Sequence, residues 1–490
     1  MNLEPRAYQA QIIDSVKRNG NTLVVLPTGL GKTLIALSLM EKTISEGGNA
    51  LFLTPTKPLA RQHAATIQNT LDLAQSDVAF VTGEIPGHKR QALYSSKICV
   101  STPQTIRNDI RSMVYPANNT KFVVFDEAHR AVGGYAYVEI AGSMPEGCLF
   151  LALTASPGGD LARIREVLSN LRIRNIEIRT ESDEDVRPFV KNLAHNWISV
   201  ELSPRMREAD SILSSLADAY AQRLARSFAK PPVISKRQFV LYGQRLRAMR
   251  HPAKYTLLSH YYTLLHIIHM QELMQTQGPY PFLSYLQKLE NSSSKSAKIL
   301  AKSQALSRAK QLLLEAGDHP KTERLLRLLS SLRGKKVIVF VQYRDQIKRI
   351  KELLDAHGFS SRIFVGKKDG FTRRMQEETM DVFRRDGFSI LIASSIGEEG
   401  LDIPAVDSVI FHEPIPSEIR SIQRRGRAGR FRDGSVYILM AKSTRDEHYY
   451  WASKKREMKM KEILLSLQKA LERNRPALPG NGQSKLGSFM

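Results

Sequence analysis

Short runs of apolar and β-branched residues alternate with longer segments of helical character in the first part of the chain. Such runs are typical of strands that are buried on both faces of a parallel sheet. They lie at Thr22 to Leu26, Ala50 to Thr54, Val78 to Thr82, Ile98 to Thr102, Phe122 to Phe125 and Leu149 to Thr154. The alternation predicts a doubly wound α/β domain over about residues 1–200.

A second set of apolar runs predicts another parallel sheet. These runs lie at Val337 to Val341, Arg362 to Val365, Ile390 to Ala393, Val409 to His412 and Val436 to Met440. They place a second α/β domain at residues 321–450. Two domains of like pattern are expected to face each other across a cleft, where open α/β sheets bind ligands.

The remaining segments show other patterns. Residues 201–320 contain helix-period segments and no strand-like run, which predicts an inserted all-helical domain. Residues 451–475 read as a basic amphipathic helix, and residues 476–490 form a tail rich in Gly, Pro and Ser that is expected to be unstructured.

The charge of the chain indicates what kind of partner it binds. Lys and Arg total 72 against 48 Asp and Glu, a net charge of +24, which favours nucleic acid as a partner. The hydrophobic content of 42% is ordinary for a folded protein. The insert contains 17 basic and 8 acidic residues, and no acidic residue lies between Asp218 and Glu272. That block contains Arg223, Arg226, Lys230, Lys236, Arg237, Arg245, Arg247, Arg250 and Lys254.

Two interpretations of the basic block stay open. It is either a solvated helix face or a contact to a DNA duplex or junction through phosphates, and we favour the contact. Three tyrosines lie close by in the sequence: Tyr255, Tyr261 and Tyr262. They either stack on bases or belong to the helical core, and the core role is the more common one.

The two cysteines, Cys99 and Cys148, each lie inside an apolar run, so we expect core residues in a reducing compartment without a disulfide or a zinc site. The first residues show no apolar signal segment, and apolar stretches such as Cys148 to Ala155 are shorter than the roughly 18 residues of a membrane span. A cytoplasmic protein with no membrane partner is expected.

The segment Leu26 to Thr33 (LPTGLGKT) reads as a phosphate-binding loop between a strand and a helix. Backbone N–H groups of Thr28, Gly29 and Gly31 are predicted to hold phosphates. Lys32 would neutralise the β and γ phosphates, and the Thr33 hydroxyl would bind Mg²⁺. Leu26 stands where the strict pattern has its first glycine, so a plain glycine-rich turn is the alternative.

A DEAH sequence, Asp126 to His129, follows a strand-like run. Asp126 is suited to hold Mg²⁺ through water, and Glu127 to orient and deprotonate the attacking water. Alone, such carboxylates are often solvated loop charges; together with Lys32 they predict an ATP site. His129 is either a surface residue or a sensor of the γ-phosphate.

The segment Gln423 to Arg430 (QRRGRAGR) is the third part of the site. Arg427 and Arg430 are predicted to act as arginine fingers on the γ-phosphate, with Gln423 positioning the water. In isolation such a cluster suggests a nucleic-acid patch, but its place after the second set of strands favours the finger role. ATP cleavage would then move the two domains relative to each other.

With these segments in order, the chain resembles superfamily 2 helicases, most closely the archaeal Hef branch, which is related to the Fanconi anaemia M translocase and to Dicer and RIG-I-like helicases. The resemblance covers about residues 1–460 and implies two RecA-like motor domains around the helical insert. Pro5 to Gln9 is similar to the Q-motif, which implies that Gln9 reads adenine with help from Arg6 or Tyr8.

Other segments resemble the motifs that contact the nucleic-acid strand. By this resemblance, Thr154 and Ser156 couple the ATP site to strand grip together with His129, and Gly400 and Asp402 face the ribose. The implied strand contacts are Thr56, Lys57, Thr102, Gln342, Ser394 and Ser395, from segments Thr54 to Leu59, Thr102 to Thr105, Phe340 to Arg344 and Ser394 to Pro404.

The resemblance implies an ATP- and Mg²⁺-dependent DNA helicase or translocase, of 3′ to 5′ polarity, acting on stalled forks and Holliday junctions in repair or fork restart. A double-stranded RNA translocase and an ATP-switched nucleic-acid-binding scaffold are the alternatives. Hef proteins often carry a nuclease domain, but no such acidic cluster is seen here, so any nuclease is expected to be a separate partner. Gln483, Leu486 and Phe489 have the spacing of a peptide that docks on a sliding clamp, a loose pattern that also arises by chance.

Overall fold

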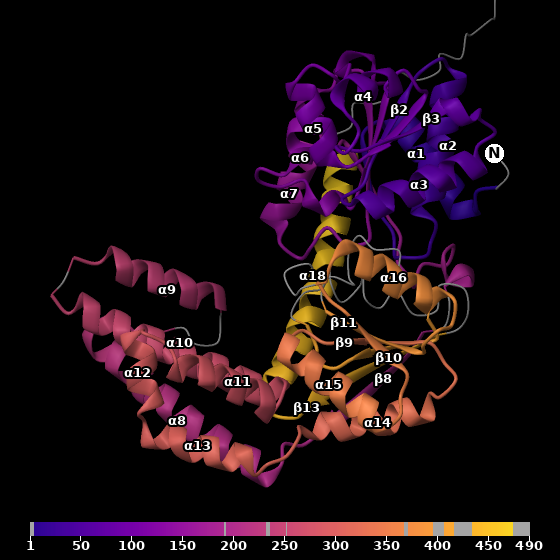
Figure 1. The fold of residues 1–490 in the computed structure, drawn as a ribbon. Coiled ribbons are helices and arrows are strands. Elements are labelled where there is room, and N and C mark those ends of the chain that lie inside the picture. Colours follow the sequence, from indigo (N-terminus) through magenta and orange to yellow (C-terminus); the bar gives the residue numbers. More distant parts are fainter. Residues whose placement is uncertain are drawn as a thin grey trace, which may run out of the picture. The chain divides into compact units, whose positions relative to one another are not determined.

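A computed structural model describes residues 4–190, 193–231, 236–250, 252–366, 371–394, 406–415 and 434–473. The chain divides into two compact units, residues 1–190 with 455–490, and residues 191–454. Each unit contains a parallel sheet with helices (Figure 1). The predicted fold of two α/β domains with a helical insert is confirmed.

The first unit has a parallel sheet in the order β3-β4-β2-β5-β6-β1-β7 among its described residues. Its strands are β1 (Thr22–Val25), β2 (Ala50–Leu53), β3 (Val78–Val81), β4 (Ile98–Ser101), β5 (Phe122–Asp126), β6 (Leu149–Thr154) and β7 (Asn175–Ile178). Its helices are α1 (Ala7–Asn19), α2 (Lys32–Ser45), α3 (Lys57–Thr70), α4 (Gly87–Leu93), α5 (Pro103–Arg111), α6 (Ala136–Ser143) and α7 (Leu161–Asn170). Cys99 and Cys148 are buried and unpaired, as predicted.

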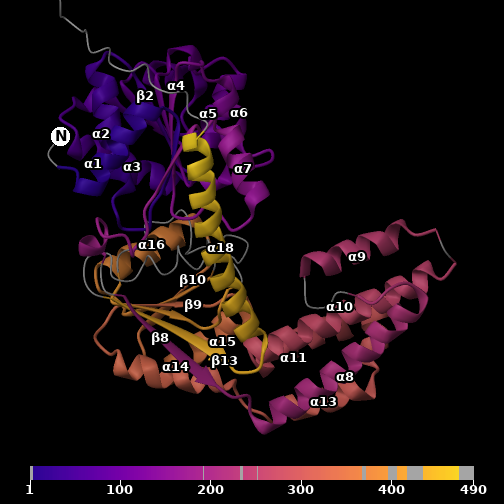
Figure 2. The same ribbon diagram turned by 180° about the vertical axis from the view of Figure 1, so that it is seen from behind.

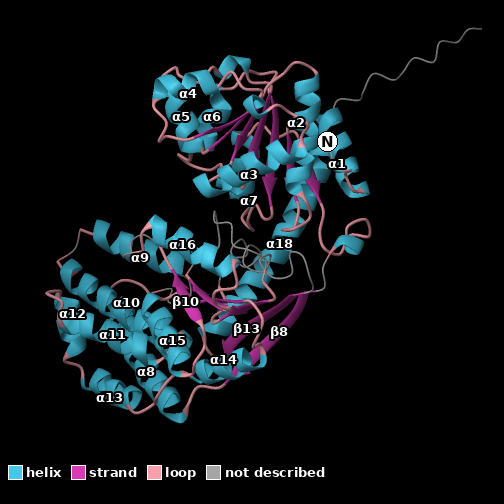
Figure 3. Ribbon diagram, turned by 45° about the vertical axis from the view of Figure 1, so that its right-hand side comes forward, coloured by secondary structure: helices cyan, strands magenta, loops and turns pink. Residues whose placement is uncertain are grey.

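The second unit also has a parallel sheet, with β8, β10 and β13 labelled in Figure 3. Among its described residues the strand order is β10-β11-β9-β12-β13-β8. Its strands are β8 (Leu193–Val200), β9 (Val337–Phe340), β10 (Ser361–Phe364), β11 (Ile390–Ala393), β12 (Ser408–Phe411) and β13 (Gly434–Ala441). Its helices outside the insert are α14 (Pro320–Ser331), α15 (Arg344–Ala356) and α16 (Arg373–Arg384). Helix α18 (Arg445–Arg473) begins in this unit and ends in the first.

Two domain boundaries differ from the sequence prediction. The first domain was expected to end at residue 200, but β8 pairs with β13 in the second sheet, so the boundary lies near residue 190. The reason is that β8 is an edge strand with an exposed face, where Trp197 is 51% exposed, and lacks a continuous apolar run. Helix α18 begins at Arg445, ahead of the predicted residue 451.

The insert is all-helical, as predicted, over its described residues. It consists of α8 (Pro204–Ser227), α9 (Lys236–Ala248), α10 (Lys254–Thr276), α11 (Pro279–Glu290), α12 (Lys295–Ala301) and α13 (Gln304–Leu314). Helices α10 and α13 both pack along α8 (Figure 2). Tyr261 is buried against Phe239, with ring centroids 4.8 Å apart, whereas Tyr255 is 81% exposed. The core interpretation therefore holds for Tyr261 and is wrong for Tyr255, which occupies the exposed first turn of α10.

Among the described residues, no helix combines the length and the apolar character that crossing a membrane requires.

Candidate functional site

The phosphate-binding loop connects β1 to α2, as the sequence predicts. Gly29 and Gly31 both have positive φ angles, +85° and +72°, a conformation that favours glycine. Gly31 is the N-cap of α2 and has no side chain to cover the amides of the first turn. A Cβ at Gly31 would lie 2.4 Å from Gln9 Nε2. The loop thus presents a helix N-terminus with bare backbone, which suits a phosphate.

The start of α1 holds this loop. Gln9 donates from Nε2 to the carbonyls of Leu30 and Gly31 at 3.2 and 3.3 Å, and the Tyr8 hydroxyl donates to Leu30 O at 2.8 Å. Gln9 Oε1 accepts from the backbone N–H of Arg6 at 2.8 Å. These bonds fix the loop relative to α1, while recognition of adenine by Gln9 and Arg6 stays a prediction.

Lys32 lies at the mouth of the loop. Its ammonium group donates to Leu26 O at 2.9 Å and to Pro27 O at 3.2 Å. Thr28 in the loop and Thr33 in the first turn of α2 are half-buried. Lys32 and Thr33 are thus the first two residues of α2, at the helix N-terminus predicted to bind phosphates.

The carboxyl end of β5 carries Asp126 and Glu127. Asp126 Oδ2 lies 3.5 Å from Thr54 Oγ1 and 3.6 Å from His63 Nε2. Glu127 has a positive φ of 51°, a strained conformation for a non-glycine residue that is often found at functional sites. This turn of the backbone separates the two carboxylates after the strand.

A chain of polar contacts leads from Glu127 to the predicted coupling motif. Glu127 Oε2 lies 3.3 Å from His129 Nδ1, which lies 3.2 Å from Thr154 Oγ1. Thr154 Oγ1 in turn accepts from Ser156 N at 3.1 Å. His129, Thr154 and Ser156 are all buried, so the surface alternative for His129 is wrong.

The pKa of Glu127 is lowered. Burial alone would raise this pKa, but the hydrogen bond and charge of His129, with the charges of Lys32 and Arg130, outweigh it. Glu127 is therefore ionised at neutral pH and suited to accept a proton.

The second half of α18 packs on the coupling motif within the first unit. Ser156 Oγ lies 3.0 Å from Met460 Sδ, and a Cβ at Gly159 would lie 2.9 Å from Arg456 O. Leu464 is fully buried on the same helix. The sequence predicted this helix but not its contact with Ser156.

Two further residues of the site carried no motif signal. The Tyr137 hydroxyl donates to Asp126 O at 2.5 Å and to Leu53 O at 3.2 Å, which ties the ends of β5 and β2 together. His63 contacts Asp126 from α3. The sequence does not indicate either residue, because their neighbours resemble no phosphate or metal motif. Only the fold brings them to the site.

The predicted strand contacts of the first unit lie at helix N-termini after β2 and β4. Thr56 is the N-cap of α3, and Lys57 in its first turn forms an ion pair with Glu84. Thr102 is the N-cap of α5 and shares a hydrogen bond of 3.0 Å with the Thr105 hydroxyl. Helix N-termini at one sheet edge suit backbone phosphates.

In the second unit, Gln342 and Ser394 follow β9 and β11. The Gln342 side chain is exposed, and Ser394 donates its backbone N–H to Phe364 O at 3.1 Å. The other predicted positions lie outside the described residues and stay predictions: Ser395, Gly400, Asp402, Gln423, Arg427, Arg430, Gln483, Leu486 and Phe489.

The basic block of the insert lies on α8, α9 and α10. Arg223, Arg226, Arg245, Arg247 and Arg250 are exposed and Lys254 is partly exposed, whereas the side chains of Lys236 and Arg237 are not among those described. The guanidinium of Arg223 lies 4.7 Å from the ring centre of Tyr220. Such exposed cations are free of the core and available to solvent or phosphates.

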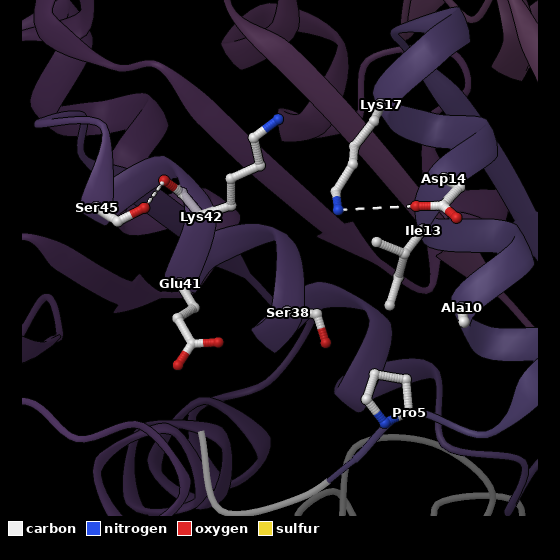
Figure 4. A pocket seen from close by; sticks show the side chains of 9 residues that line it. All are labelled: Pro5, Ala10, Ile13, Asp14, Lys17, Ser38, Glu41, Lys42 and Ser45. Carbon is white, nitrogen blue, oxygen red and sulfur yellow. Dashed lines mark hydrogen bonds and ion pairs between the residues drawn. The ribbon is translucent and has the colours of Figure 1, made fainter.

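A groove between α1 and α2 is separate from the phosphate loop (Figure 4). It is lined by Pro5, Ala10, Ile13, Asp14, Lys17, Ser38, Glu41, Lys42 and Ser45. Because none of residues 26–33 lines it, we assign it no part in holding phosphates.

The residues of the loop and of β5 fit a nucleotide with Mg²⁺. In the described ranges no three His, Cys, Asp or Glu side chains gather as a metal site. Magnesium in nucleotide sites needs only one or two protein ligands, since phosphates and waters supply the rest. Thr33, in the first turn of α2, and Asp126, at the end of β5, would be such ligands.

A parallel sheet with a phosphate loop and a DEAH strand end, followed by a second parallel sheet, is the architecture of a superfamily 2 helicase. Comparison with known families agrees. Residues 2–159 match the model described as type III restriction enzyme, res subunit, and residues 320–432 match the helicase conserved C-terminal domain.

Individual similar proteins indicate which branch of this superfamily the chain resembles. The crystal structure of the Pyrococcus furiosus Hef helicase domain is 39% identical, with a TM-score of 0.71, and the match covers 92% of this chain and 98% of that one. The ATP-dependent DNA helicase mph1 of Neurospora crassa is 32% identical over 92% of this chain and 42% of its own length. A Methanocaldococcus jannaschii protein, provisionally named an ATP-dependent RNA helicase, is 35% identical over 95% of this chain and 61% of its own.

The chain belongs to the Hef branch of the superfamily 2 helicases, a group with ATP-dependent helicases among its named members. It spans less than two thirds of the length of the two curated relatives, 61% and 42%.

Proposed function

We propose that the chain is an ATP-dependent DNA helicase or translocase of 3′ to 5′ polarity that acts on branched DNA, such as stalled forks and Holliday junctions, in repair or fork restart. The observation that carries this proposal is the chain of contacts from Glu127 through His129 and Thr154 to Ser156. It joins a carboxylate suited to ATP hydrolysis to the predicted coupling motif. The relative from Neurospora, named a DNA helicase, supports the choice of substrate.

In the proposed reaction, Lys32 and the loop amides hold the triphosphate, and Glu127 takes the proton of the attacking water. Mg²⁺, bound by Thr33 and Asp126, would neutralise charge that develops on the phosphates. Gln423, Arg427 and Arg430 complete the site from the second domain, and Gly400 and Asp402 contact the ribose. The state of the γ-phosphate then reaches Ser156 through His129.

Strand grip is proposed to act through the phosphodiester backbone. Thr56, Lys57 and Thr102 of the first domain and Gln342, Ser394 and Ser395 of the second are the contacts. Backbone contacts make movement along the strand independent of sequence.

The basic block of the insert is proposed to hold a second arm of the branch. Replacing Arg223, Arg226, Arg245, Arg247 and Arg250 by Gln should weaken fork binding and lower its salt dependence by about one unit of log–log slope per lost phosphate contact. DNA-free ATPase should be nearly unchanged. Fork affinity measured from low to high salt, beside ATPase rates, tests this expectation.

A matched control is the pair Lys298→Gln and Lys302→Gln, exposed cations on the insert outside the basic block. These changes should affect fork affinity much less. Equal losses of fork binding and DNA-free ATPase in the arginine variant would contradict a separate role of the insert.

Duplex RNA is the competing substrate, favoured by the name of the Methanocaldococcus relative. Stimulation of ATPase by forked DNA, duplex RNA and single strands, compared at one salt concentration, separates the two. Greater stimulation by duplex RNA than by forked DNA would reject the DNA proposal.

The tail is proposed to dock on a sliding clamp, and a separate nuclease is a proposed partner. The spacing of Gln483, Leu486 and Phe489 supports the clamp proposal. Phe489→Ala should abolish retention on an immobilised clamp, whereas Lys485→Ala should not. If the Phe489→Ala chain were retained as well as the parent, the proposal that the tail docks on a sliding clamp would be rejected.

A further inference from the structure

A buried polar cluster lies where the insert joins the second sheet. We call it the joint cluster and define it as Glu272, Gln275, His319, Lys321, Glu413, Asp446 and Tyr449. Lys321 and Asp446 are fully buried, and Glu272, His319 and Glu413 are at most 3% exposed. Buried charges are costly unless they are paired and hydrogen-bonded, so this cluster needs a physical account.

Lys321 joins three elements. Its ammonium donates to Asp446 Oδ2 at 2.8 Å and to Thr276 O at 2.6 Å. Asp446 Oδ2 also accepts from Ala441 N at 3.0 Å. Thr276 is the last residue of α10, where a cation satisfies the helix carbonyls. One ammonium therefore connects the end of α10 to β13 and to the start of α18.

His319 adds two bonds at the same helix end. Burial, followed by the charge of Lys321, holds the pKa of His319 well below its usual value, so the ring is neutral. Its Nδ1 accepts from Lys321 N at 3.0 Å, and its Nε2 donates to Gln275 O at 3.0 Å. The Gln275 side chain accepts from Arg445 N at 3.2 Å. The last turn of α10 is thus bonded to His319, just before α14, and to Arg445, at the start of α18.

Glu272 reaches further, to the loop after β9. Glu272 Oε1 accepts from the Tyr449 hydroxyl at 2.6 Å. Tyr343 lies against the same helix, with its ring centroid 6.2 Å from that of His269, and burial together with the charge of Glu272 raises the pKa of its hydroxyl. Tyr343 follows Gln342, the predicted strand contact. Glu413, two residues after β12, accepts the backbone N–H of Gln342. The loop is therefore bonded to Glu413 and lies within the electrostatic influence of Glu272 of the insert.

A second contact from the insert holds the other end of this loop. Asp345, in the first turn of α15, accepts from Ser284 Oγ of α11 at 2.9 Å and lies 3.5 Å from Lys288 Nζ. Residues 342–345 are consequently bonded to α11 and to Glu413 after β12, and Tyr343 packs against α10. Any rotation of the insert against the sheet would have to break these bonds together.

We propose that Glu272 is a positioning residue for the strand-contacting loop at Gln342, so that the insert and this loop move as one body. Binding of a branch arm by the insert then sets the grip of the loop on the tracking strand. This inference rests on the proposed function, because it requires the insert to bind branched DNA. It identifies the route by which the branch regulates the motor.

The test uses Glu272→Gln and Tyr449→Phe in the full chain, with Glu290→Gln as the matched control. Glu290 also lies on the insert. Its Oε1 is 2.9 Å from Lys310 Nζ, so the pair that it forms lies within the insert. The ratio of fork-stimulated to single-strand-stimulated kcat is measured, with KM for each DNA and thermal melting. The ratio should fall about tenfold in Glu272→Gln, within the usual range of coupling between sites, and less in Tyr449→Phe. DNA-free ATPase and the control should match the parent.

The outcomes separate the inference from the proposed function. A parent protein without fork preference rejects the proposed function and the inference with it. A parent with fork preference that Glu272→Gln retains rejects the inference alone. If Glu272 had a merely structural role, Glu272→Gln would lower both stimulated rates equally and would also lower the melting temperature. That result would overturn the inference as well. Should Glu272→Gln fail to fold, Tyr449→Phe decides, because it keeps the carboxylate and removes one donor.

Discussion

Glu127→Gln is expected to lower kcat for ATP hydrolysis by about 10² to 10⁴-fold, while the Kd for ATP changes little. The lowered pKa of Glu127 keeps its carboxylate ionised beside His129, and an amide of the same shape cannot take a proton from water. Steady-state ATPase and equilibrium binding of a nucleotide analogue measure the two effects separately. The variant should trap the ATP-bound form.

Lys32→Ala provides the contrast, since it should weaken nucleotide binding as well as hydrolysis. A Glu127→Gln enzyme that hydrolyses ATP at more than a tenth of the parent rate would remove Glu127 from the role of base. Branch migration or unwinding that persists in Lys32→Ala would reject the motor and favour a scaffold that uses ATP as a switch.

Lys321→Ala is expected to reduce the free energy of unfolding of the second unit by about 3–5 kcal/mol, because it leaves Asp446 buried without its cation. Replacing both residues by apolar ones of similar size, as in Lys321→Met with Asp446→Leu, should restore most of that loss. Urea unfolding followed by circular dichroism measures the change. Lys310, which is partly exposed and pairs with Glu290, is the control, and Lys310→Ala should cost no more than about 1 kcal/mol.

The acidity of Asp446 gives the same prediction a pH dependence. Burial raises the pKa of Asp446 to about 6 even though Lys321 opposes the shift. Because the folded pKa is raised, the carboxyl destabilises the fold increasingly as pH rises through about 6. The defect of Lys321→Ala should therefore be largest above that pH and smaller near pH 5. A defect below about 1 kcal/mol at neutral pH would show that the buried pair carries little stability.

The sequence predicts the central strands well because they are buried on both faces. Runs such as Val337 to Val341 admit few other structures, and the strands lie within a residue or two of their predicted ends. Strands β7 and β8 were missed because polar residues interrupt their apolar pattern, Asn175 and Glu177 in β7 and His195 and Asn196 in β8. Missing β8 also misplaced the boundary at residue 200.

Site residues divide in the same way. Lys32, Asp126 and Glu127 are predicted as site residues from local spacing, because phosphate binding needs a fixed turn of backbone. The joint cluster has no such signature: Lys321 and Asp446 are 125 positions apart, and nothing near either residue indicates the other. Long-range polar contacts become visible only after the chain has folded.

The pairing of β8 with β13 constrains the order in which the protein can be made. Leu193 lies opposite Gly434, so one edge of the second sheet must wait on the ribosome while the helical insert and most of that sheet are synthesised. During this interval the insert has time to form its own core and to bring the two ends of its segment together. The sheet of the second motor domain is therefore expected to be completed only after β13 has been synthesised, later than the core of the insert.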